Sequence, residues 1–392
     1  MSTVTAAPAR AFTGARIFDG TSWHDDKVLV IADRRIDAVV APTDVAEGKE
    51  IIDVSGQMIV PGFIDLQVNG GGGVLLNEAT TVAGIAQICS AHARFGTTGL
   101  LPTLITDTPE ITAAAIEAGR QAMRQRVPGF LGLHLEGPHL SLARKGAHDP
   151  ALIRPMLEED LARILACRGV FDALMTTVAP ESVTPEQVAR LAEAGFIVSI
   201  GHTDSSYAAV QSYAAAGART VTHLFNAMSP LAHREPGVVG AALDIGALHA
   251  GMIADGIHVH PVAMSVALRA KTGPGRIFLV TDAMSTIGTD LTSFTLNGRE
   301  ILRRDGRLTL ADGTLAGADI DMISSVRYVR DTLELPLEEA LRMASAYPAE
   351  AAKLSDRKGA IRSGLDADFV VLTQNLGVQS TWIGGACVYR AG

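Results

Sequence analysis

Eight short apolar runs of β-strand character alternate with Ala-rich stretches of helical period along most of this chain. This alternation is typical of parallel strands joined by helices, and eight such units close into a (β/α)8 barrel. The sequence therefore predicts an α/β fold with a (β/α)8 TIM barrel over residues 61–362. The eight predicted strands are 63–68, 97–103, 130–136, 173–180, 197–202, 220–225, 249–255 and 277–282.

Both ends of the chain carry further strand-like runs, within 13–56 and at 366–372 and 381–390. The N-terminal strands are too few to form a stable unit alone, so we expect both termini to pair in one small β-sandwich domain. This discontinuous domain would comprise residues 1–60 and 363–392. After the eighth predicted strand, turns at Asn297-Gly298, Asp305-Gly306 and Asp312-Gly313 predict β-hairpins inserted over the barrel mouth, where they can cover a substrate.

Charge and cysteine usage narrow the partners and the compartment. Lys plus Arg total 33 against 42 Asp plus Glu, and the net charge of −9 disfavours nucleic acid and anionic membrane surfaces. Cys89, Cys167 and Cys387 lie far apart and lack the CxxC spacing of thiolate metal sites. No signal-peptide segment and no apolar run of about 18 residues occurs. We expect a soluble, cytoplasmic protein with no nucleic-acid or membrane partner.

Four of the predicted strands end in a carboxylate or an imidazole: Glu136, His202, His223 and Asp282. Active sites of such barrels lie at the carboxyl ends of the strands, so these side chains are expected to meet. Two imidazoles and a carboxylate can hold one divalent ion and leave a position open for water. Such an ion lowers the pKa of water and polarises a carbonyl, and Asp282 is a candidate proton carrier. The pattern predicts a metal-dependent hydrolase.

Each of these residues also has a simpler interpretation. A single histidine at a strand end is more often a hydrogen-bonded core residue than a ligand, and Asp282 could only cap the following loop or orient a ligand. The simpler interpretation, however, must hold at three equivalent barrel positions at once. We therefore favour Glu136, His202 and His223 as metal ligands.

The end of the first predicted strand indicates how many ions bind. Barrel metallohydrolases with two ions often carry two histidines there, one residue apart, whereas Gln67 and Asn69 stand at these positions here. Side-chain amides are weaker ligands for zinc-like ions than imidazoles are. The sequence predicts one divalent ion per subunit, for which zinc is the first choice and iron, manganese and cobalt stay open.

Several motifs together resemble the N-acetylglucosamine-6-phosphate deacetylase family of the amidohydrolase superfamily, and they run nearly end to end. PGFID (61–65) marks only the superfamily, whereas four further motifs together are specific to this family. They are LEGP (135–138), THLFNAM (222–228), REPG (234–237) and ADGIH (254–258). The resemblance implies hydrolysis of N-acetyl-D-glucosamine 6-phosphate to D-glucosamine 6-phosphate and acetate, in amino-sugar catabolism or cell-wall recycling.

The resemblance also implies roles for single residues. Asp282 would be the general base and acid, and His258 would help to polarise the amide carbonyl. Arg234 would bind the phosphate of the neighbouring subunit's substrate, which implies a homodimer. The remaining substrate-binding residues would be Ala147 and His148 at the sugar hydroxyls, Asn226 and Ala227 at the phosphate, Asp255 and Gly256 of ADGIH, and Leu315, Ala316 and Gly317 over the ligand.

Other functions stay open at this point. The same chemistry could act on N-acetylgalactosamine 6-phosphate or on an unphosphorylated N-acyl compound such as an N-acyl amino acid. A barrel could also serve as a non-enzymatic sugar-phosphate sensor, because fold does not determine function, although the intact set of site residues argues against this. Asp319 and Asp321 add negative charge near the expected phosphate, which is unfavourable unless their carboxylates point away.

Overall fold

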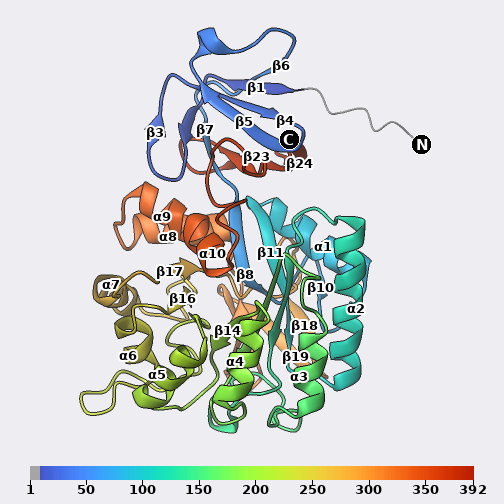
Figure 1. The fold of residues 1–392 in the computed structure, drawn as a ribbon, viewed down its shortest axis with the longest axis vertical. Helices are drawn as coiled ribbons and strands as arrows, with labels where there is room; N and C mark the ends of the chain where they lie inside the picture. The colour runs from blue at the N-terminus through green and yellow to red at the C-terminus, as the bar shows by residue number, and fades with distance from the viewer. Residues whose placement is uncertain (1–8) are drawn as a thin grey trace.

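The computed structural model describes residues 9–392 and has eight parallel strands at its centre (Figure 1). The strands neighbour one another in chain order, as in a (β/α)8 barrel. Each predicted run overlaps one of them, so the predicted barrel is confirmed. The strands are β8 (Phe63–Val68), β11 (Thr97–Ile105), β12 (Gly132–Glu136), β13 (Ala173–Val178), β14 (Ile197–Ile200), β15 (Thr220–Val221), β16 (His249–Met252) and β17 (Ile277–Leu279).

The ring closes between β8 and the segment that follows β17. Val68 forms an isolated parallel bridge with Ala283, and the Asp282 N–H donates to the Gln67 carbonyl over 2.9 Å. The Asn69 N–H donates in turn to the Ala283 carbonyl over 2.9 Å. These contacts bring the end of the eighth strand beside the end of the first.

Helices cover the outside of the ring, and their buried apolar residues join those of the strands in one large core (Figure 1). α4 shows how the sequence sets a helix start, because Thr184 and Gln187 form a capping box and Pro185 occupies the first turn. Within residues 9–392 no helix is long and apolar enough to cross a membrane. The helices are α1 (Val82–Ala93), α2 (Pro109–Gln125), α3 (Glu158–Leu165), α4 (Pro185–Glu193), α5 (Tyr207–Ala216), α6 (Gly237–Asp244), α7 (Pro261–Ala270), α8 (Met322–Asp331), α9 (Leu337–Ala344) and α10 (Ala346–Ala351).

A small β-sandwich built from both ends of the described chain sits against the barrel, as predicted (Figure 1). Phe12 packs edge-on against Phe369 and Trp382, with ring centroids 5.0 and 4.9 Å away, so residues from the two termini share one core. The predicted boundaries at 60/61 and 362/363 stay a prediction, and residues 1–8 lie outside the described part. One sheet has β5 (Arg35–Val40), β4 (Val28–Ala32), β1 (Arg10–Thr13) and β6 (Glu50–Asp53); the other has β24 (Ala386–Arg390), β23 (Val378–Ile383), β22 (Phe369–Leu372), β7 (Met58–Pro61), β2 (Arg16–Phe18) and β3 (Trp23–His24).

The predicted hairpins after the last barrel strand form a four-stranded antiparallel insertion. Asn297-Gly298 and Asp305-Gly306 have positive φ at both positions, which suits two-residue hairpin turns. Apolar side chains of the insertion pack on Ile105 and Met284 at the barrel mouth. Its strands are β18 (Ser293–Leu296), β19 (Arg299–Arg304), β20 (Arg307–Thr309) and β21 (Leu315–Ala318).

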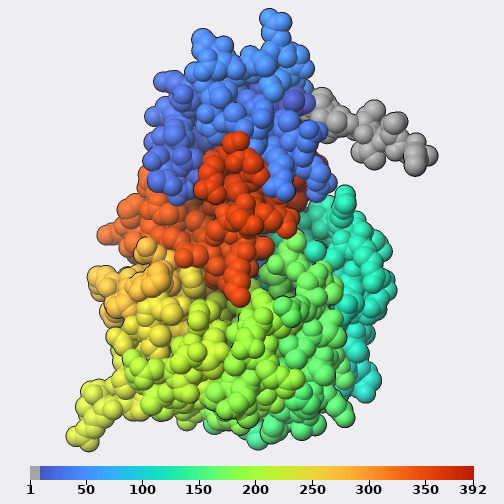
Figure 2. All heavy atoms as spheres, viewed as in Figure 1, coloured from blue at the N-terminus to red at the C-terminus, as the bar shows by residue number. Residues whose placement is uncertain are grey.

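The seam between the β-domain and the barrel contains a buried ionic cluster. In Figure 2 the orange-red C-terminal part of the chain fills the space between the blue β-domain and the green and yellow barrel. Lys358, which is only 8% exposed, lies 3.1 Å from an Asp366 carboxylate oxygen and also contacts Asp368. Burial disfavours the ammonium, but these two carboxylates outweigh that effect and raise the pKa of Lys358. The lysine is therefore charged, and its removal leaves Asp368 without a cationic partner and takes one of several cations from Asp366.

Replacing Lys358 should destabilise the protein markedly. We expect Lys358→Met to lower the free energy of unfolding by about 3–5 kcal/mol, the usual effect of removing one partner of a buried ion pair. Lys353→Met is the matched control, because Lys353 is exposed and its amino group only approaches the Gly195 carbonyl at 3.4 Å. Thermal and urea unfolding of both variants measure the difference. Equal loss in the two variants would contradict this assignment.

Candidate active site

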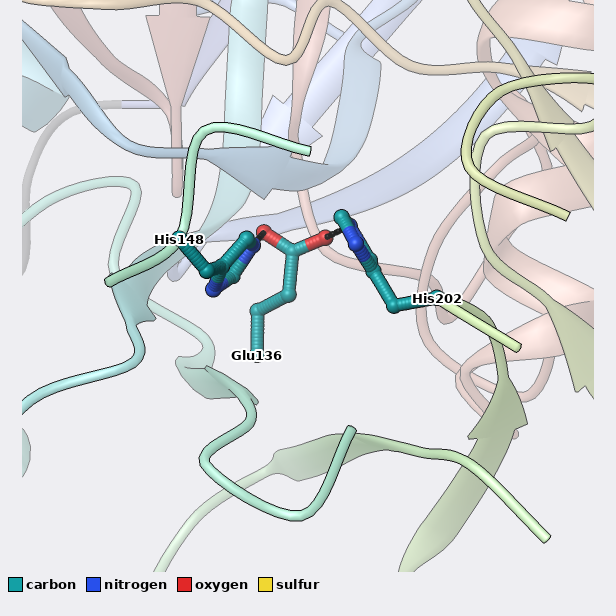
Figure 3. Close-up of side chains that lie close together, drawn as sticks. All are labelled: Glu136, His148 and His202. Carbon is teal, nitrogen blue, oxygen red and sulfur yellow. Dashed lines mark ion pairs between the residues drawn. The ribbon is translucent and has the colours of Figure 1, made fainter. Parts of the chain in front are cut away.

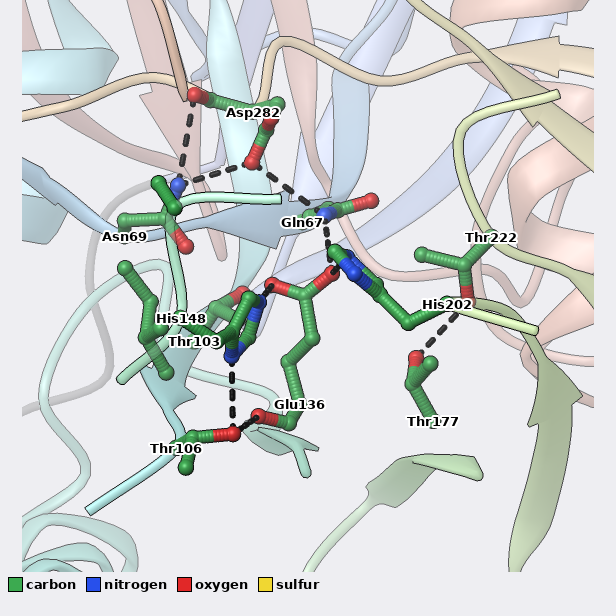
Figure 4. Close-up of polar contacts among 12 residues, drawn as sticks. Gln67, Asn69, Thr103, Thr106, Glu136, His148, Thr177, His202, Thr222 and Asp282 are labelled. Carbon is green, nitrogen blue, oxygen red and sulfur yellow. Dashed lines mark hydrogen bonds and ion pairs between the residues drawn. The ribbon is translucent and has the colours of Figure 1, made fainter. Parts of the chain in front are cut away.

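The four predicted chemistry-bearing residues lie together at the carboxyl ends of the barrel strands. Figure 4 shows three of them, Glu136, His202 and Asp282. Glu136 is the last residue of β12, and the other three follow β14, β15 and β17. His202, His223 and Asp282 have φ values of 48°, 23° and 52°, a region that non-glycine residues rarely adopt. At three strand ends the backbone is thus held in an uncommon conformation, as is often found at functional sites.

Glu136, His202 and His223 converge on one point. The Oε1 atom of Glu136 lies 3.3 Å from His202 Nε2 and 3.2 Å from His223 Nε2, and the two ring nitrogens are 3.0 Å apart. All three side chains are buried. Burial alone would raise the pKa of Glu136, but its close contacts with the two imidazoles hold it well below its usual range.

The orientation of the rings fits a bound cation. His202 Nδ1 donates to the Arg144 carbonyl over 2.9 Å, so in the neutral ring Nε2 presents a lone pair to Glu136. His223 Nδ1 has no hydrogen-bond partner among the residues described. The lone pair of His202 Nε2, 3.3 Å from Glu136 Oε1, needs either a proton or a cation between the two atoms. A nitrogen, nitrogen and oxygen donor set of this kind suits a zinc-type ion.

His148 is a further member of the cluster (Figure 3). Its Nε2 lies 4.0 Å from Glu136 Oε2, and its donor atom lies within 4.8 Å of those of Glu136 and His202. Nδ1 is 2.7 Å from the Thr106 hydroxyl, which itself donates to the Glu136 carbonyl, so Nδ1 carries the proton and Nε2 is an acceptor. Burial lowers the pKa of His148 to about 3. His148 is therefore a neutral acceptor at the edge of the site.

Two amides connect the carboxylates (Figure 4). Gln67 Nε2 lies 3.1 Å from both Glu136 Oε1 and Asp282 Oδ1, and Asn69 Nδ2 donates to Asp282 Oδ1 over 2.7 Å. Burial and the Glu136 charge raise the pKa of Asp282 to about 6. Two carboxylates whose pKa values move in opposite directions suit a ligand and a proton carrier.

His258 approaches the same site with one ring nitrogen already used. Its Nδ1 lies 2.6 Å from Asp255 Oδ2, and Asp255 Oδ1 accepts from the backbone N–H groups of Ile257 and His258. Gly256 must stay small, because a Cβ there would lie 2.3 Å from the Tyr328 hydroxyl oxygen. Asp255 and Gly256 support His258 from behind, and their predicted contact with substrate stays a prediction.

A pocket of about 250 Å³ contains most of the predicted site. Arg234 is outside it, in an exposed loop between β15 and α6. The sequence did not predict five other residues of the pocket wall, because they are apolar or neutral and carry no catalytic motif. Only their nearness to strand ends and hairpin turns could have indicated them. They are Ile105, Ile253, Met284, Leu296 and Thr314. The predicted residues along its wall are Ala147, His148, Asn226, Ala227, His258, Leu315, Ala316 and Gly317, together with the four strand-end residues.

The acidic residues of the LAGADIDM segment point away from this pocket. Asp319 accepts from Arg303 Nε over 2.6 Å and from the Thr286 hydroxyl over 2.8 Å. Asp321 caps α8 by accepting from the Ser324 N–H over 2.8 Å. Neither carboxylate is free to repel an anionic substrate, so the electrostatic objection raised by the sequence does not apply.

The fold and site are those of a metal-dependent amidohydrolase. The chain matches the family described as "Amidohydrolase family" over residues 58–388 and therefore belongs to the amidohydrolase family. It is 44% identical to the N-acetylgalactosamine-6-phosphate deacetylase of Shewanella sp. (strain ANA-3), over 85% of this chain and 84% of that protein.

Two further relatives indicate which branch of the amidohydrolase family the chain resembles. The N-acetylglucosamine-6-phosphate deacetylase of Haemophilus influenzae is 36% identical over 92% of this chain and 94% of that protein. The crystal structure of N-acetylglucosamine-6-phosphate deacetylase from Pasteurella multocida matches with a TM-score of 0.93 at 35% identity, covering 98% of this chain and 100% of that chain. The resemblance to this deacetylase family is confirmed.

Loss of one ligand should remove the metal. We expect His202→Ala and Glu136→Ala each to reduce bound divalent metal from about one equivalent per chain to a small fraction, since three donors are the minimum for a catalytic zinc site. His24→Ala is the control, because His24 pairs with Asp19 in the β-domain. Elemental analysis of purified protein, with circular dichroism to check folding, measures this. Full metal content in folded Glu136→Ala would show that another residue is the ligand.

Proposed function

We propose that the protein hydrolyses the N-acetyl group of N-acetyl-D-glucosamine 6-phosphate to give D-glucosamine 6-phosphate and acetate. The observation that supports this most is the convergence of Glu136, His202 and His223 beside Asp282 in a covered pocket. The names of the relatives, which share 30–44% identity with this chain over most of its length, point to the same reaction. We place the enzyme in the cytoplasm, in line with its unpaired cysteines.

Glu136, His202 and His223 would hold one divalent ion, for which zinc suits the donor set best. When bound, such an ion lowers the pKa of water and polarises a carbonyl oxygen, the two effects that amide hydrolysis needs. The amides of Gln67 and Asn69 are weak ligands and already hydrogen-bond to the carboxylates. A single ion per subunit follows.

Asp282 would take a proton from water and deliver it to the leaving amine. Both amides bind its Oδ1, and no described residue hydrogen-bonds to Oδ2, so Oδ2 is the oxygen that receives the proton. His258 would direct its Nε2 to the acetyl carbonyl, because Asp255 occupies Nδ1. Both side chains are therefore held in a fixed orientation before substrate binds, which lowers the reorganisation needed during reaction.

The remaining pocket residues would bind the sugar phosphate. His148 Nε2 would accept from a sugar hydroxyl, and Asn226 and Ala227 of the same pocket would contact the phosphate. Leu315, Ala316 and Gly317 of the insertion would cover the ligand. The exposed loop with Arg234 would extend to the phosphate of a neighbouring subunit, where a guanidinium matches a phosphate dianion. We propose a homodimer on this basis.

Asp282→Asn should abolish turnover while retaining the metal. An amide cannot accept the proton from water, so we expect kcat to fall by about 10²–10⁴-fold. Asp319→Asn is the matched control, because Asp319 pairs with Arg303 outside the pocket and should keep most of the activity. Acetate release and metal content are measured on both variants. Normal turnover in Asp282→Asn would contradict the proposed role.

The identity of the sugar has a second candidate. The relative at 44% identity is named for N-acetylgalactosamine 6-phosphate, whereas those at 36% are named for N-acetylglucosamine 6-phosphate. The two sugars differ only in the orientation of one hydroxyl, so the same site chemistry serves both.

An acetate-release assay on metal-loaded protein distinguishes these candidates. We expect the highest kcat/KM for N-acetylglucosamine 6-phosphate and at least ~10-fold less for the unphosphorylated sugar, because a charge-assisted contact from Arg234 is lost. Arg234→Ala should narrow that difference by raising KM for phosphorylated substrates only. A higher kcat/KM for N-acetylgalactosamine 6-phosphate would favour the second candidate. If neither sugar phosphate nor the unphosphorylated sugar releases acetate, the proposed function is overturned.

A further inference from the structure

A second cavity lies at the opposite end of the barrel from the active site, at the seam with the β-domain. Figure 1 shows the two parts of the chain that meet at this seam. Its volume is about 560 Å³, larger than the catalytic pocket of about 250 Å³ and within the range of small-molecule sites. Its lining comes from the turn between β4 and β5 at 33–35 and from parts of 357–384. The last turn of α2 adds Ala122 and Met123, the segment after α2 adds 126–131, and Thr98 and Asp172 complete the wall. Nothing in the proposed reaction uses this cavity.

Most charges along the cavity neutralise one another. Arg357 lies 2.9 Å from Asp172 and 3.2 Å from Asp366, and Lys358 contacts Asp366 at 3.1 Å. Arg35 lies 3.5 Å from Asp366 as well. These three cations are therefore balanced by acids of the seam.

Two guanidinium groups remain. Throughout the described range 9–392, the side chains of Arg34 and Arg126 make no hydrogen bond or ion pair, although both line the cavity. Among the acids that line the cavity, only Asp33 belongs to none of these ion pairs. Five cations and four acids line the cavity, so it carries a small excess of positive charge in a chain of net charge −9.

The backbone holds both arginines in uncommon conformations. Asp33 and Arg34 have φ values of 46° and 70°, at turn positions where Asn-Gly is the usual pair, and Arg126 has a φ of 54°. Gly384 leaves room for the Arg34 guanidinium, because a Cβ there would lie 2.9 Å from its Nη2. Asp33 and Arg34 form the hairpin turn between β4 and β5, and Arg126 is the left-handed C-cap of α2, so both arginines extend from well-defined backbone positions.

We propose that this cavity binds a small metabolite through a phosphate group, held between Arg34 of the β-domain and Arg126 of the barrel. A phosphate dianion matches two guanidinium groups in charge and offers three acceptor oxygens to their planar donors. The cavity leaves space for a sugar or nucleoside beside the phosphate. Because the two arginines belong to different domains, the bound anion ties the domains together and stabilises the folded protein.

Inorganic phosphate is the probe, used at constant ionic strength to separate binding from charge screening. Thermal unfolding is followed during phosphate titration of the metal-loaded protein, of Arg34→Gln/Arg126→Gln, and of Arg124→Gln. Arg124 is the matched control, because it is an exposed arginine of α2 that does not line the cavity. We expect phosphate to raise the unfolding temperature of the wild type and of the control. In the double variant the phosphate concentration needed for half of this effect should rise at least ~10-fold.

Phosphate is also expected to enter the catalytic pocket, so its inhibition of acetate release is measured on the same three proteins. An unchanged inhibition constant and unchanged kcat in the double variant would assign the lost stabilisation to the seam cavity.

If the protein releases no acetate, the unfolding titration still tests the cavity independently of the proposed function. If the double variant does not fold, the single variants Arg34→Gln and Arg126→Gln replace it, with the same expected loss of affinity in each. An identical phosphate response in wild type and the arginine variants would overturn the proposal, and so would equal loss in Arg124→Gln.

Discussion

The hydrogen bond from the Asp282 N–H to the Gln67 carbonyl is the contact on which the catalytic mouth depends, because it closes the barrel. In an open sheet the first and last strands would be at opposite edges, and Asp282 would be far from the first-strand amides. Closure instead allows Gln67 Nε2 to bind Asp282 and Glu136 at 3.1 Å each. The same main-chain contact thus completes the fold and joins the two carboxylates.

Two buried carboxylates so close together repel each other, and the protein resolves this by giving them different partners. Imidazoles surround Glu136 and hold its pKa low, whereas burial and Glu136 itself raise the pKa of Asp282 to about 6. Amide donors from Gln67 and Asn69 stabilise the anion of Asp282 without supplying a full positive charge. One acid is thereby suited to bind a cation and the other to exchange a proton.

Much of this arrangement could be predicted, because it follows from periodicity. Alternating apolar runs predicted all eight strands, and the end of a barrel strand is where a functional side chain must lie. Other features depend on tertiary contacts that no local pattern encodes. The left-handed backbone of His202 and His223 turns their rings inward, and Asp319 is neutralised by Arg303 from a strand of the insertion. His148 approaches Glu136 only because the loop after β12 folds back over the mouth.

A chain of hydrogen bonds runs below the site, and the direction of each bond follows from one acceptor. Figure 4 shows its link between Thr177 and Thr222. The Leu66 carbonyl can only accept, so His134 Nδ1 carries the proton and Nε2 must accept from Thr177. Thr177 has no second proton to give, so it accepts from Thr222, and Thr222 accepts from Ser199 by the same reasoning. Burial lowers the pKa of His134 to about 4, which keeps it neutral and preserves this order. Strands β12 to β15 are therefore joined below the metal ligands by a satisfied, uncharged network, which restrains the positions from which Glu136, His202 and His223 extend.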